Sequence, residues 1–204
     1  MTADKLKILA VGDVHGDKAF IKSLADTAAK ENVDLVVLAG DLTYADQSTD
    51  GIIGPFLAKG KKVLLVHGNH ETPATADFLA QLYNATNLHG YGIELKGIGI
   101  FGAGGAAIGP NPTSATDIYE NLKHAHDKVK HLARKLMVVH EHPSDSKMEI
   151  GGMFPGSWAV RKAAETFKPD IVVCGHIHEA GGIEEKIGKT RVINVARTPK
   201  IIEL

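Results

Sequence analysis

Five short apolar segments, each followed closely by aspartate, asparagine or histidine, constrain the fold of this chain more than any other feature. We expect these segments to be buried strands at residues 6–11, 33–39, 62–66, 136–139 and 170–174. The polar residues that follow them, in the same order, are Asp13 with His15, Asp41, Asn69 with His70, His140, and His176 with His178. Ligands of α/β proteins bind beyond the carboxyl ends of the strands. The sequence therefore predicts that these side chains meet at one edge.

Helical segments separate most of the expected strands, an alternation that is typical of parallel sheets. Helices are expected at residues 17–32, 51–59, 114–134 and 157–167. Residues 90–101 indicate antiparallel hairpins, and the last strands are expected at residues 183–187 and 191–195. Residues 102–112 are so rich in glycine and proline that a flexible loop is expected. We predict an α/β fold of two packed β-sheets flanked by helices, a four-layer αββα sandwich, as one domain over residues 1–204.

Composition narrows the classes of function. With 23 basic and 24 acidic residues, a net charge of −1 and 5% aromatic residues, the chain lacks the basic excess and the stacking platforms of a general nucleic-acid binder. The single cysteine, Cys174, excludes an intramolecular disulfide and is typical of a reducing compartment. No apolar run approaches the roughly 20 residues of a membrane helix, and the N-terminus lacks a signal-peptide layout. We therefore expect a cytoplasmic protein that binds no membrane.

The residue types at the strand ends are those that bind metal ions. Carboxylate and imidazole ligands suit zinc, manganese, iron or nickel, and a thiolate-only site is excluded. The set offers more ligands than one ion needs, and Asp41, central in the chain order, is the natural bridge between two ions. Two divalent ions carry more positive charge than Asp13 and Asp41 neutralise, so the site would attract phosphate. Ions about 3.5–4 Å apart also polarise a phosphoryl oxygen and lower the pKa of a water, which supplies a hydroxide nucleophile near neutral pH.

The same residues carry a family resemblance. The calcineurin-like metallophosphoesterases have the signature D-x-H, G-D, G-N-H-[D/E], a lone histidine after a strand, and G-H-x-H. This chain has, in that order, Gly12-Asp13-Val14-His15, Gly40-Asp41, Gly68-Asn69-His70-Glu71, His140 and Gly175-His176-Ile177-His178. It therefore resembles this superfamily, whose metallo-dependent phosphatase fold is an αββα sandwich, from about residue 6 to residue 195.

The resemblance implies a role for each block. One metal ion would be bound by Asp13, His15 and His178, a second by Asn69, His140 and His176, and Asp41 would bridge them. His70 would not bind metal, because in such enzymes this histidine lies by the leaving group as a general acid or a stabiliser of the transition state. Either Glu71 or a backbone carbonyl would orient His70.

Departures from related patterns narrow the substrate class. Small bacterial-type and retromer-type members resemble G-N-C-D at the third block and lack the histidine that is present here as His70. Protein phosphatases and dinucleoside tetraphosphatases resemble G-D-x-x-D-R-G at the second block, whereas this chain has Tyr44 and Ala45 in place of Asp-Arg. The arginine that would bind a phosphomonoester is missing, which favours a phosphodiester or another small phosphate ester.

Three residues are candidates for a supporting or substrate-binding role. His142 lies two residues after His140 and is an alternative ligand or a neighbour of the ligands. Arg197 follows the last expected strand and would contact substrate if that strand end reaches the site, and Glu71 adjoins His70. We expect specificity to come from the loops at residues 44–51, 102–112 and 142–155.

Three functional hypotheses follow. The leading one is a hydrolase of phosphoric ester bonds, a phosphodiesterase rather than a phosphomonoesterase, that acts on a small phosphate ester with two divalent ions (Mn, Fe, Zn, Ni or Co). One alternative is a metal-binding interaction module with a vestigial site, as the resemblance to retromer-type members suggests. The other is a nuclease, which the absence of a basic excess disfavours.

Overall fold

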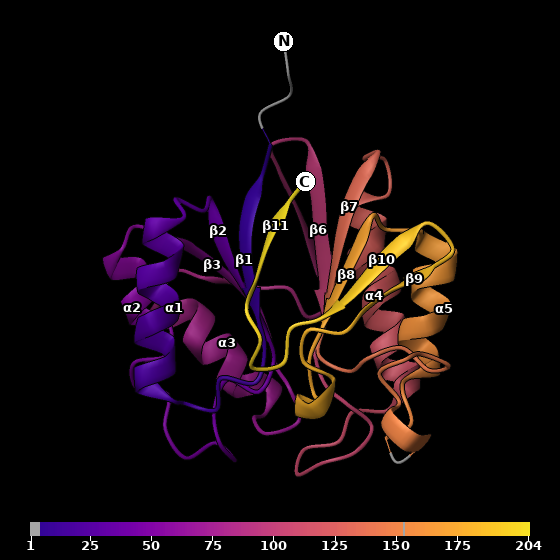
Figure 1. Cartoon of the computed structure of the whole chain (residues 1–204), viewed down its shortest axis with the longest axis horizontal. Helices are drawn as coiled ribbons and strands as arrows, with labels where there is room; N and C mark the ends of the chain where they lie inside the picture. The colour runs from indigo at the N-terminus through magenta and orange to yellow at the C-terminus, as the bar shows by residue number, and fades with distance from the viewer. Residues whose placement is uncertain (1–4, 153) are drawn as a thin grey trace.

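Two β-sheets pack face to face in the computed structural model, which describes residues 5–152 and 154–204 (Figure 1). The first sheet has the strand order β11 (Lys200–Glu203), β1 (Lys7–Val11), β2 (Leu35–Ala39), β3 (Lys62–Val66) and β4 (Thr86–Asn87). The second has the order β5 (Tyr91–Leu95), β6 (Ile98–Ala103), β7 (Arg134–Val139), β8 (Ile171–Cys174), β10 (Thr190–Asn194) and β9 (Glu184–Ile187). The edge strands β11, β5 and β9 pair antiparallel, and all the other pairs are parallel.

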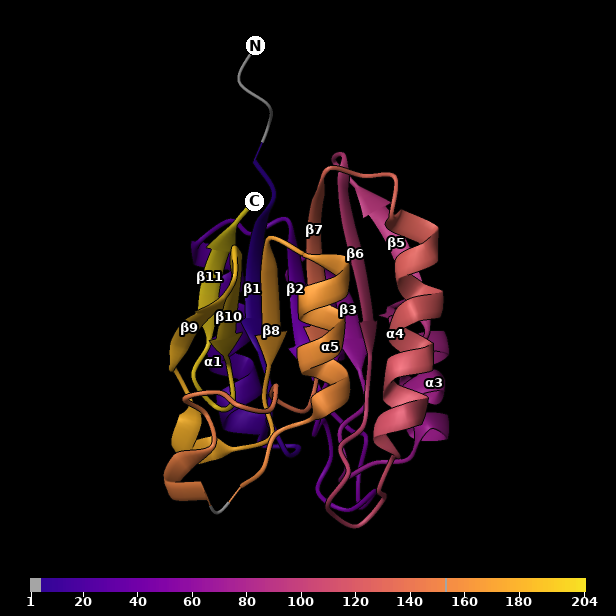
Figure 2. The same ribbon diagram turned by 90° about the vertical axis from the view of Figure 1, so that its right-hand side faces the viewer.

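Helices cover the outer face of each sheet (Figures 1 and 2). The first sheet carries α1 (Lys18–Lys30), α2 (Gly54–Ala58) and α3 (Pro73–Leu82), and the second carries α4 (Ala115–Val129) and α5 (Trp158–Phe167). Two short 3₁₀ helices, at Ile150–Gly152 and His178–Ala180, lie in the connecting loops. The four-layer αββα sandwich expected from the sequence is therefore confirmed.

The central strands are buried on both faces, which is why they appear in the sequence as continuous apolar runs. In β1, Ile8 and Ala10 belong to the core between the two sheets. Leu9 and Val11 point the other way, into the core beneath the helices of the first sheet. The alternation of side chains along a strand thus supplies two hydrophobic cores from one short segment.

Polar side chains fix the starts of the long helices. Asp17 accepts a hydrogen bond from the backbone N–H of Phe20 at 3.0 Å, and Ser114 accepts one from Asp117 at 3.1 Å. Both are N-caps, which satisfy backbone donors that have no partner in the first helical turn. The helices α1 and α4 accordingly begin one residue after the capping residues.

The structure differs from the sequence prediction in a few elements. The helix expected at residues 51–59 is the single turn Gly54–Ala58, and the one expected at 114–134 ends at Val129 because Arg134 already begins β7. The helix α3 and the strands β4 and β11 were not predicted. The two-residue strand β4 is defined by its pairing with β3, and β11 by its pairing with β1, so neither depends on a local pattern alone.

The strand order places the candidate residues at one end of the sandwich. The loops that follow β1, β2, β3, β7 and β8 lie together at its lower end in Figure 1, whereas the start of β1 and the end of β11 lie at the upper end. No helix in the described part of the chain is long and apolar enough to cross a membrane.

Candidate active site

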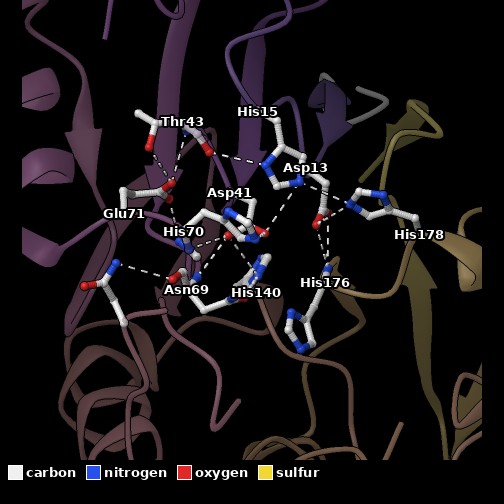
Figure 3. A network of polar contacts seen from close by, with 12 residues as sticks. Asp13, His15, Asp41, Thr43, Asn69, His70, Glu71, His140, His176 and His178 are labelled. Carbon is white, nitrogen blue, oxygen red and sulfur yellow. Dashed lines mark hydrogen bonds and ion pairs between the residues drawn. The ribbon is translucent and has the colours of Figure 1, made fainter. Parts of the chain in front are cut away.

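Strand ends from both sheets converge on one cluster of polar side chains (Figure 3). Backbone hydrogen bonds join the sheets at this edge, since Gly12 N–H donates to Val195 (3.0 Å) and Arg197 N–H donates to Gly12 (3.1 Å). The structure brings together all the ligands and the catalytic residue expected from the sequence: Asp13, His15, Asp41, Asn69, His70, His140, His176 and His178. They come from five strand ends that lie far apart in the sequence.

Four residues of this cluster have an unusual backbone conformation. The φ angles of Asp13 (59°), His15 (45°), Asp41 (49°) and His176 (72°) are all positive. Residues other than glycine rarely adopt this left-handed region, and those that do are concentrated at functional sites. Asp13 N–H donates to Gly40 and His15 N–H donates to Asp41, each at 2.9 Å, so the first two turns hold each other in place.

The side chains form three overlapping groups that could each hold an ion. Within each group the ligand atoms lie within 4.8 Å of one another, and the groups are Asp13, His15 and His178; His15, Asp41 and His70; and Asp41, His140 and His176. The first and third correspond to the ligand sets that the resemblance implies, with Asn69 added beside His140. Distance alone would also admit His70 as a ligand, so its separate role rests on the resemblance.

The surroundings of His140 fit a cation. Its Nδ1 lies 2.9 Å from the carbonyl of Ala39, which can only accept, so Nδ1 carries the proton and Nε2 presents a lone pair. That lone pair faces Asn69 Oδ1 at 3.0 Å and Asp41 Oδ1 at 3.4 Å, two further electron donors. Burial by itself lowers the pKa of His140, but the carboxylates of Asp41 and Asp13 raise it above its ordinary value, so Nε2 holds a proton more readily than usual, and a bound metal ion would take the place of that proton. Three electron donors that point at one place are the donor set of a metal ion.

The same arrangement recurs around His15. Its Nδ1 lies 3.2 Å from the carbonyl of Thr43, which leaves the lone pair on Nε2. This Nε2 is 3.2 Å from His178 Nε2 and 3.7 Å from Asp41 Oδ2, while His178 Nε2 is 3.4 Å from Asp13 Oδ1. Imidazole nitrogens and carboxylate oxygens at these separations fit a second cation next to the first.

Burial keeps two of these imidazoles in the form that binds metal. It lowers the pKa of His176 to about 3 and lowers that of His15 as well, so both rings are neutral at neutral pH. The hydrogen bond to Asp13 raises the pKa of His178, which is the most exposed of the three rings. A cation bound between Asp13 and His178 would take the place of that proton.

His70 is held by its backbone and leaves its ring at the rim of the pocket. Its N–H donates to Asp41 Oδ1 at 3.0 Å, and its Nε2 lies 3.9 Å from Asp41 Oδ2. The ring packs 4.7 Å from the ring of His15 and 5.3 Å from that of Tyr44. Within residues 5–152 and 154–204, buried Nδ1 of His70 has no hydrogen-bond partner. The His70 ring is therefore positioned by its contacts with the rings of His15 and Tyr44 and not by a hydrogen bond to Nδ1.

Glu71 joins two loops of the site and does not orient His70. Its Oε1 accepts from Gly68 N–H at 2.6 Å, and its Oε2 accepts from Thr43 N–H at 3.1 Å. Burial raises its pKa to about 7. Of the two ways in which the sequence allowed His70 to be oriented, the structure shows neither contact.

His142 and Arg197 lie beside the ligand cluster rather than in it. His142 is fully buried, and its Nε2 lies 3.3 Å from the carbonyl of Phe154. Arg197 donates to the carbonyl of Asp13 at 3.4 Å and to Asp17 Oδ2 at 2.9 Å. Arg197 does not line the pocket, so the contact that it makes is with the loop that carries Asp13 and not with the space for substrate.

A pocket of about 630 Å³ opens over the cluster. Five of the expected ligands line it together with His70, namely His15, Asp41, Asn69, His176 and His178. The remaining lining residues are Tyr44, Ile108, Gly109, Pro110, Phe154, Pro155, Ile177 and Glu179. Most of these wall residues come from the three loops expected to set specificity, although the sequence assigned none of them a role at the site. Nothing in the sequence marks these residues as part of the pocket, because an apolar loop residue lines a site only when folding places it there.

Comparison with known proteins identifies a family and a shared fold. The sequence model of the calcineurin-like phosphoesterase family matches residues 6–180. The comparison with curated proteins found no match. Among solved structures, TT1561 of Thermus thermophilus is similar at 17% identity with a TM-score of 0.77, covering 98% of each chain.

Two further structures share the fold. A dimetal phosphatase from Danio rerio is 14% identical with a TM-score of 0.62, over 94% of this chain and 87% of that one. The phosphopantetheinyl hydrolase of Mycobacterium tuberculosis is 15% identical with a TM-score of 0.61, over 96% of this chain and 91% of that one. At these identities the likeness shows the fold and not the substrate.

Proposed function

This chain belongs to the calcineurin-like phosphoesterases, and from that membership we propose that it hydrolyses a phosphodiester, or another small phosphate ester, at a dinuclear metal site. The position of Asp41 is the observation that carries the proposal. Its Oδ1 lies 3.4 Å from His140 Nε2 and its Oδ2 lies 3.7 Å from His15 Nε2. One buried carboxylate that offers an oxygen to each of two imidazole groups has the position of a bridging ligand.

The remaining ligands divide between the two ions as the resemblance implies. One ion would be held by Asp13, His15 and His178 and the other by Asn69, His140 and His176, with Asp41 between them. When bound, the ions would supply the positive charge that polarises a phosphoryl group and lowers the pKa of water. Asp41 Oδ1 also accepts the N–H groups of Asn69 (2.9 Å) and His70 (3.0 Å), which fixes its orientation before any ion binds.

His70 is the proposed general acid. In the reaction water adds to phosphorus, the phosphorus–oxygen bond to the leaving alcohol breaks, and that oxygen takes up a proton. The His70 side chain is 24% exposed and lines the pocket, so a bound ester can reach it. Its loop is held by Asp41 on one side and by the contact between Glu71 and Thr43 on the other.

The charges of the pocket support a diester rather than a monoester. Among the residues that the structure describes, no lysine or arginine lines the pocket. A phosphomonoester dianion carries one more negative charge than a diester and gains more from such a side chain. Tyr44 and Ala45 occupy the positions of the aspartate and arginine in the monoester-type motif, and Tyr44 contributes an aromatic ring instead.

The test compares two esters under the same conditions. Hydrolysis of bis-p-nitrophenyl phosphate and of p-nitrophenyl phosphate is measured with manganese, iron, zinc, nickel or cobalt, and again after chelation. We expect metal-dependent cleavage that is faster for the diester, and a loss of about 10²-fold in His70→Ala. His124→Ala is the matched control, because His124 is exposed on α4 and does not line the pocket.

The other outcomes separate the alternatives. If neither ester is cleaved although metal analysis shows two bound ions, the enzyme proposal is wrong and an interaction module with a vestigial site replaces it. If the protein binds DNA or RNA with a steep dependence on salt, a nuclease is indicated. Faster cleavage of the monoester would contradict the diester preference but not the proposal of a dinuclear site.

A further inference from the structure

The pocket has an apolar wall that the chemistry of phosphate hydrolysis does not require. Ile108 and Pro110 come from the loop between β6 and α4, and Phe154 and Pro155 come from the loop between β7 and α5. Ile108 is 60% exposed, a high value for a large aliphatic side chain. Exposed apolar side chains that gather around a concave site mark a place for an apolar group of a ligand.

The first half of this wall is fixed to the ligand cluster by hydrogen bonds. Asn111 N–H donates to the carbonyl of Asn69 at 3.0 Å, and Ala107 N–H donates to Glu141 Oε1 at 3.1 Å. Ile108 lies in the chain between Ala107 and Asn111. The partner of Asn111 is the candidate ligand Asn69, and the partner of Ala107 is Glu141, the neighbour of His140. The glycine-rich loop expected to be flexible is thus tied at two points, which hold the backbone of Ile108 beside the ligand cluster before a ligand arrives.

The second half of the wall is positioned from the same side of the cluster. The carbonyl of Phe154 lies 3.3 Å from His142 Nε2, and His142 is buried two residues after His140. Tyr44, by contrast, lies beside His70, with 5.3 Å between their ring centroids. The apolar wall therefore adjoins the Asn69 and His140 side of the site, and Tyr44 adjoins the side where the leaving group is expected.

The charges around the wall exclude a highly charged ester group. Glu179 is the one acidic lining residue besides Asp41, and no lysine or arginine is present among the described lining residues. A retained group that carries further phosphates, such as a nucleoside polyphosphate, would bring additional negative charges without a lysine or arginine of the pocket lining to pair with them. An uncharged aryl or alkyl group would instead cover apolar surface that is now in water.

We propose that the Ile108–Phe154 wall is a subsite for the retained ester group, and that the preferred substrates are phosphodiesters in which this group is an uncharged, apolar aryl or alkyl group. The proposal rests on the proposed phosphoesterase function, and it names the substrate class of that same site. Tyr44 faces the leaving group, while Ile108 and Phe154 contact the group that stays on phosphorus.

The test keeps the leaving group constant and varies the retained group. The probes are p-nitrophenyl methyl phosphate, p-nitrophenyl phenyl phosphate and the p-nitrophenyl ester of thymidine monophosphate, cleaved by the metal-loaded protein. Burial of a phenyl ring against the wall predicts a kcat/KM for the phenyl ester about 10- to 100-fold above that for the methyl ester. The thymidine group is uncharged but polar and gains less from contact with an apolar wall, so we expect the thymidine ester to fall below the phenyl ester.

Variants identify the wall as the source of this preference. Ile108→Ser and Phe154→Ser should each lower the ratio of phenyl to methyl ester cleavage several-fold, mainly through KM, because hydrophobic contact acts on bound substrate and transition state alike. Leu82→Ser is the matched control, since Leu82 on α3 is 58% exposed and lies outside the pocket. It should leave both rates unchanged.

A binding measurement separates this proposal from the proposed function. Calorimetry should show that diphenyl phosphate binds the metal-loaded protein about 10-fold or more tighter than dimethyl phosphate, with a negative heat-capacity change. Selective binding without turnover of any ester would refute the enzyme and leave the subsite. Turnover with equal rates for the phenyl and methyl esters, or with the thymidine ester preferred, would overturn the subsite and leave the enzyme.

Discussion

At the carboxyl ends of the strands the buried acids Asp13 and Asp41 accept backbone N–H groups and face imidazole rings, whereas at the opposite ends Asp34 pairs with a lysine and Asp170 accepts a backbone N–H. Asp34 pairs with Lys96 Nζ at 2.8 Å, and this hydrogen bond lowers its pKa. Asp170 accepts the N–H at the start of β7 at 2.7 Å. Asp13 and Asp41 are at most 2% exposed, and among the described residues their ion-pair partners are histidines alone.

This difference separates structural from functional charge. At the amino ends of the strands each acid has a partner within the chain, Lys96 for Asp34 and the backbone N–H of Lys135 for Asp170. At the carboxyl ends two buried carboxylates face imidazole rings, and they raise the pKa of His140 and His178, so a bound proton or a cation from solution balances the charge there. The same sheets thus carry a closed end and an end that is completed by binding.

The largest expected effect comes from neutralising one acid at the site. Asp41→Asn keeps an oxygen for the N–H groups of Asn69 and His70 but removes the charge between the two ion positions. We expect kcat/KM for bis-p-nitrophenyl phosphate to fall by about 10³-fold, the equivalent of several kcal/mol of transition-state stabilisation. The wild-type protein should also gain about 2.7 kcal/mol in unfolding free energy when metal is present at about 100 times its Kd, and the variant should lose this gain.

Asp34→Asn is the matched control at the closed end. It removes a partly exposed ion pair with Lys96, so activity should be retained while stability falls by about 1 kcal/mol or less. Metal titration by calorimetry and thermal unfolding measure both variants. Equal loss of metal binding in the two would contradict the division between the ends.

Adding one methyl group at each end gives the second-largest effect. A Cβ on Gly68 would overlap the carboxylate of Asp41, so Gly68→Ala must displace Asp41, the proposed bridging ligand. A Cβ on Gly97, in the turn before β6, would meet nothing, although its φ of +75° favours glycine. We expect Gly68→Ala to lose about 10²-fold in kcat through misplacement. Gly97→Ala should keep its activity and lose about 1 kcal/mol of stability.

The measurement for this pair is kcat together with the midpoint of thermal unfolding. A Gly68→Ala protein with wild-type kcat would show that the exact position of Asp41 is unimportant. A Gly97→Ala protein with reduced kcat would show that the two ends are coupled.

Removing an arginine at each end has a smaller effect. Arg197 donates to the carbonyl of Asp13, so Arg197→Gln should loosen the first turn and weaken metal binding by about 10-fold. Arg191 pairs with Glu184 at 2.6 Å near the start of β10, and Arg191→Gln should leave metal affinity unchanged. The Kd for metal, measured by calorimetry, is compared between the two variants. An unchanged metal affinity in Arg197→Gln would show that the contact of Arg197 with Asp13 is dispensable for metal binding.

The smallest effect is expected at the closed end. Lys96→Ala removes the lysine that pairs with Asp34, where both side chains are 31% exposed. The loss of unfolding free energy should be about 1 kcal/mol or less and should shrink as salt is added, because exposed ion pairs are screened. Urea unfolding at low and high salt measures it. A large loss that persists in high salt would show that the pair is structural rather than superficial.

Most of the fold could be predicted because its strands are buried on both faces. Such strands appear in the sequence as uninterrupted apolar runs, and β3 was predicted with the bounds that the structure shows, Lys62–Val66. The start of helix α3 has a local sequence pattern, since Thr72 caps the helix and Pro73 occupies its first turn. The strand β11 had no such signal, because a four-residue segment becomes a strand by pairing with β1.

The candidate ligands could be predicted and their surroundings could not. Asp13 and Asp41 follow strands whose ends must share an edge, so their convergence follows from the order of elements. The contact of Glu71 with Thr43, and the placing of Ile108 over the site, depend on how the loops pack. The sequence alone made Glu71 a neighbour of His70, but folding turned its carboxylate toward another loop.

The sequence by itself determined the αββα sandwich and the edge at which the candidate ligands gather, because these depend on periodicity and on chain direction. The tertiary structure decided the direction of each lone pair, the placement of Arg197 outside the pocket and the apolar wall beside the site. These features depend on contacts between segments far apart in the chain. Packing sets their geometry, and no local sequence pattern predicts it.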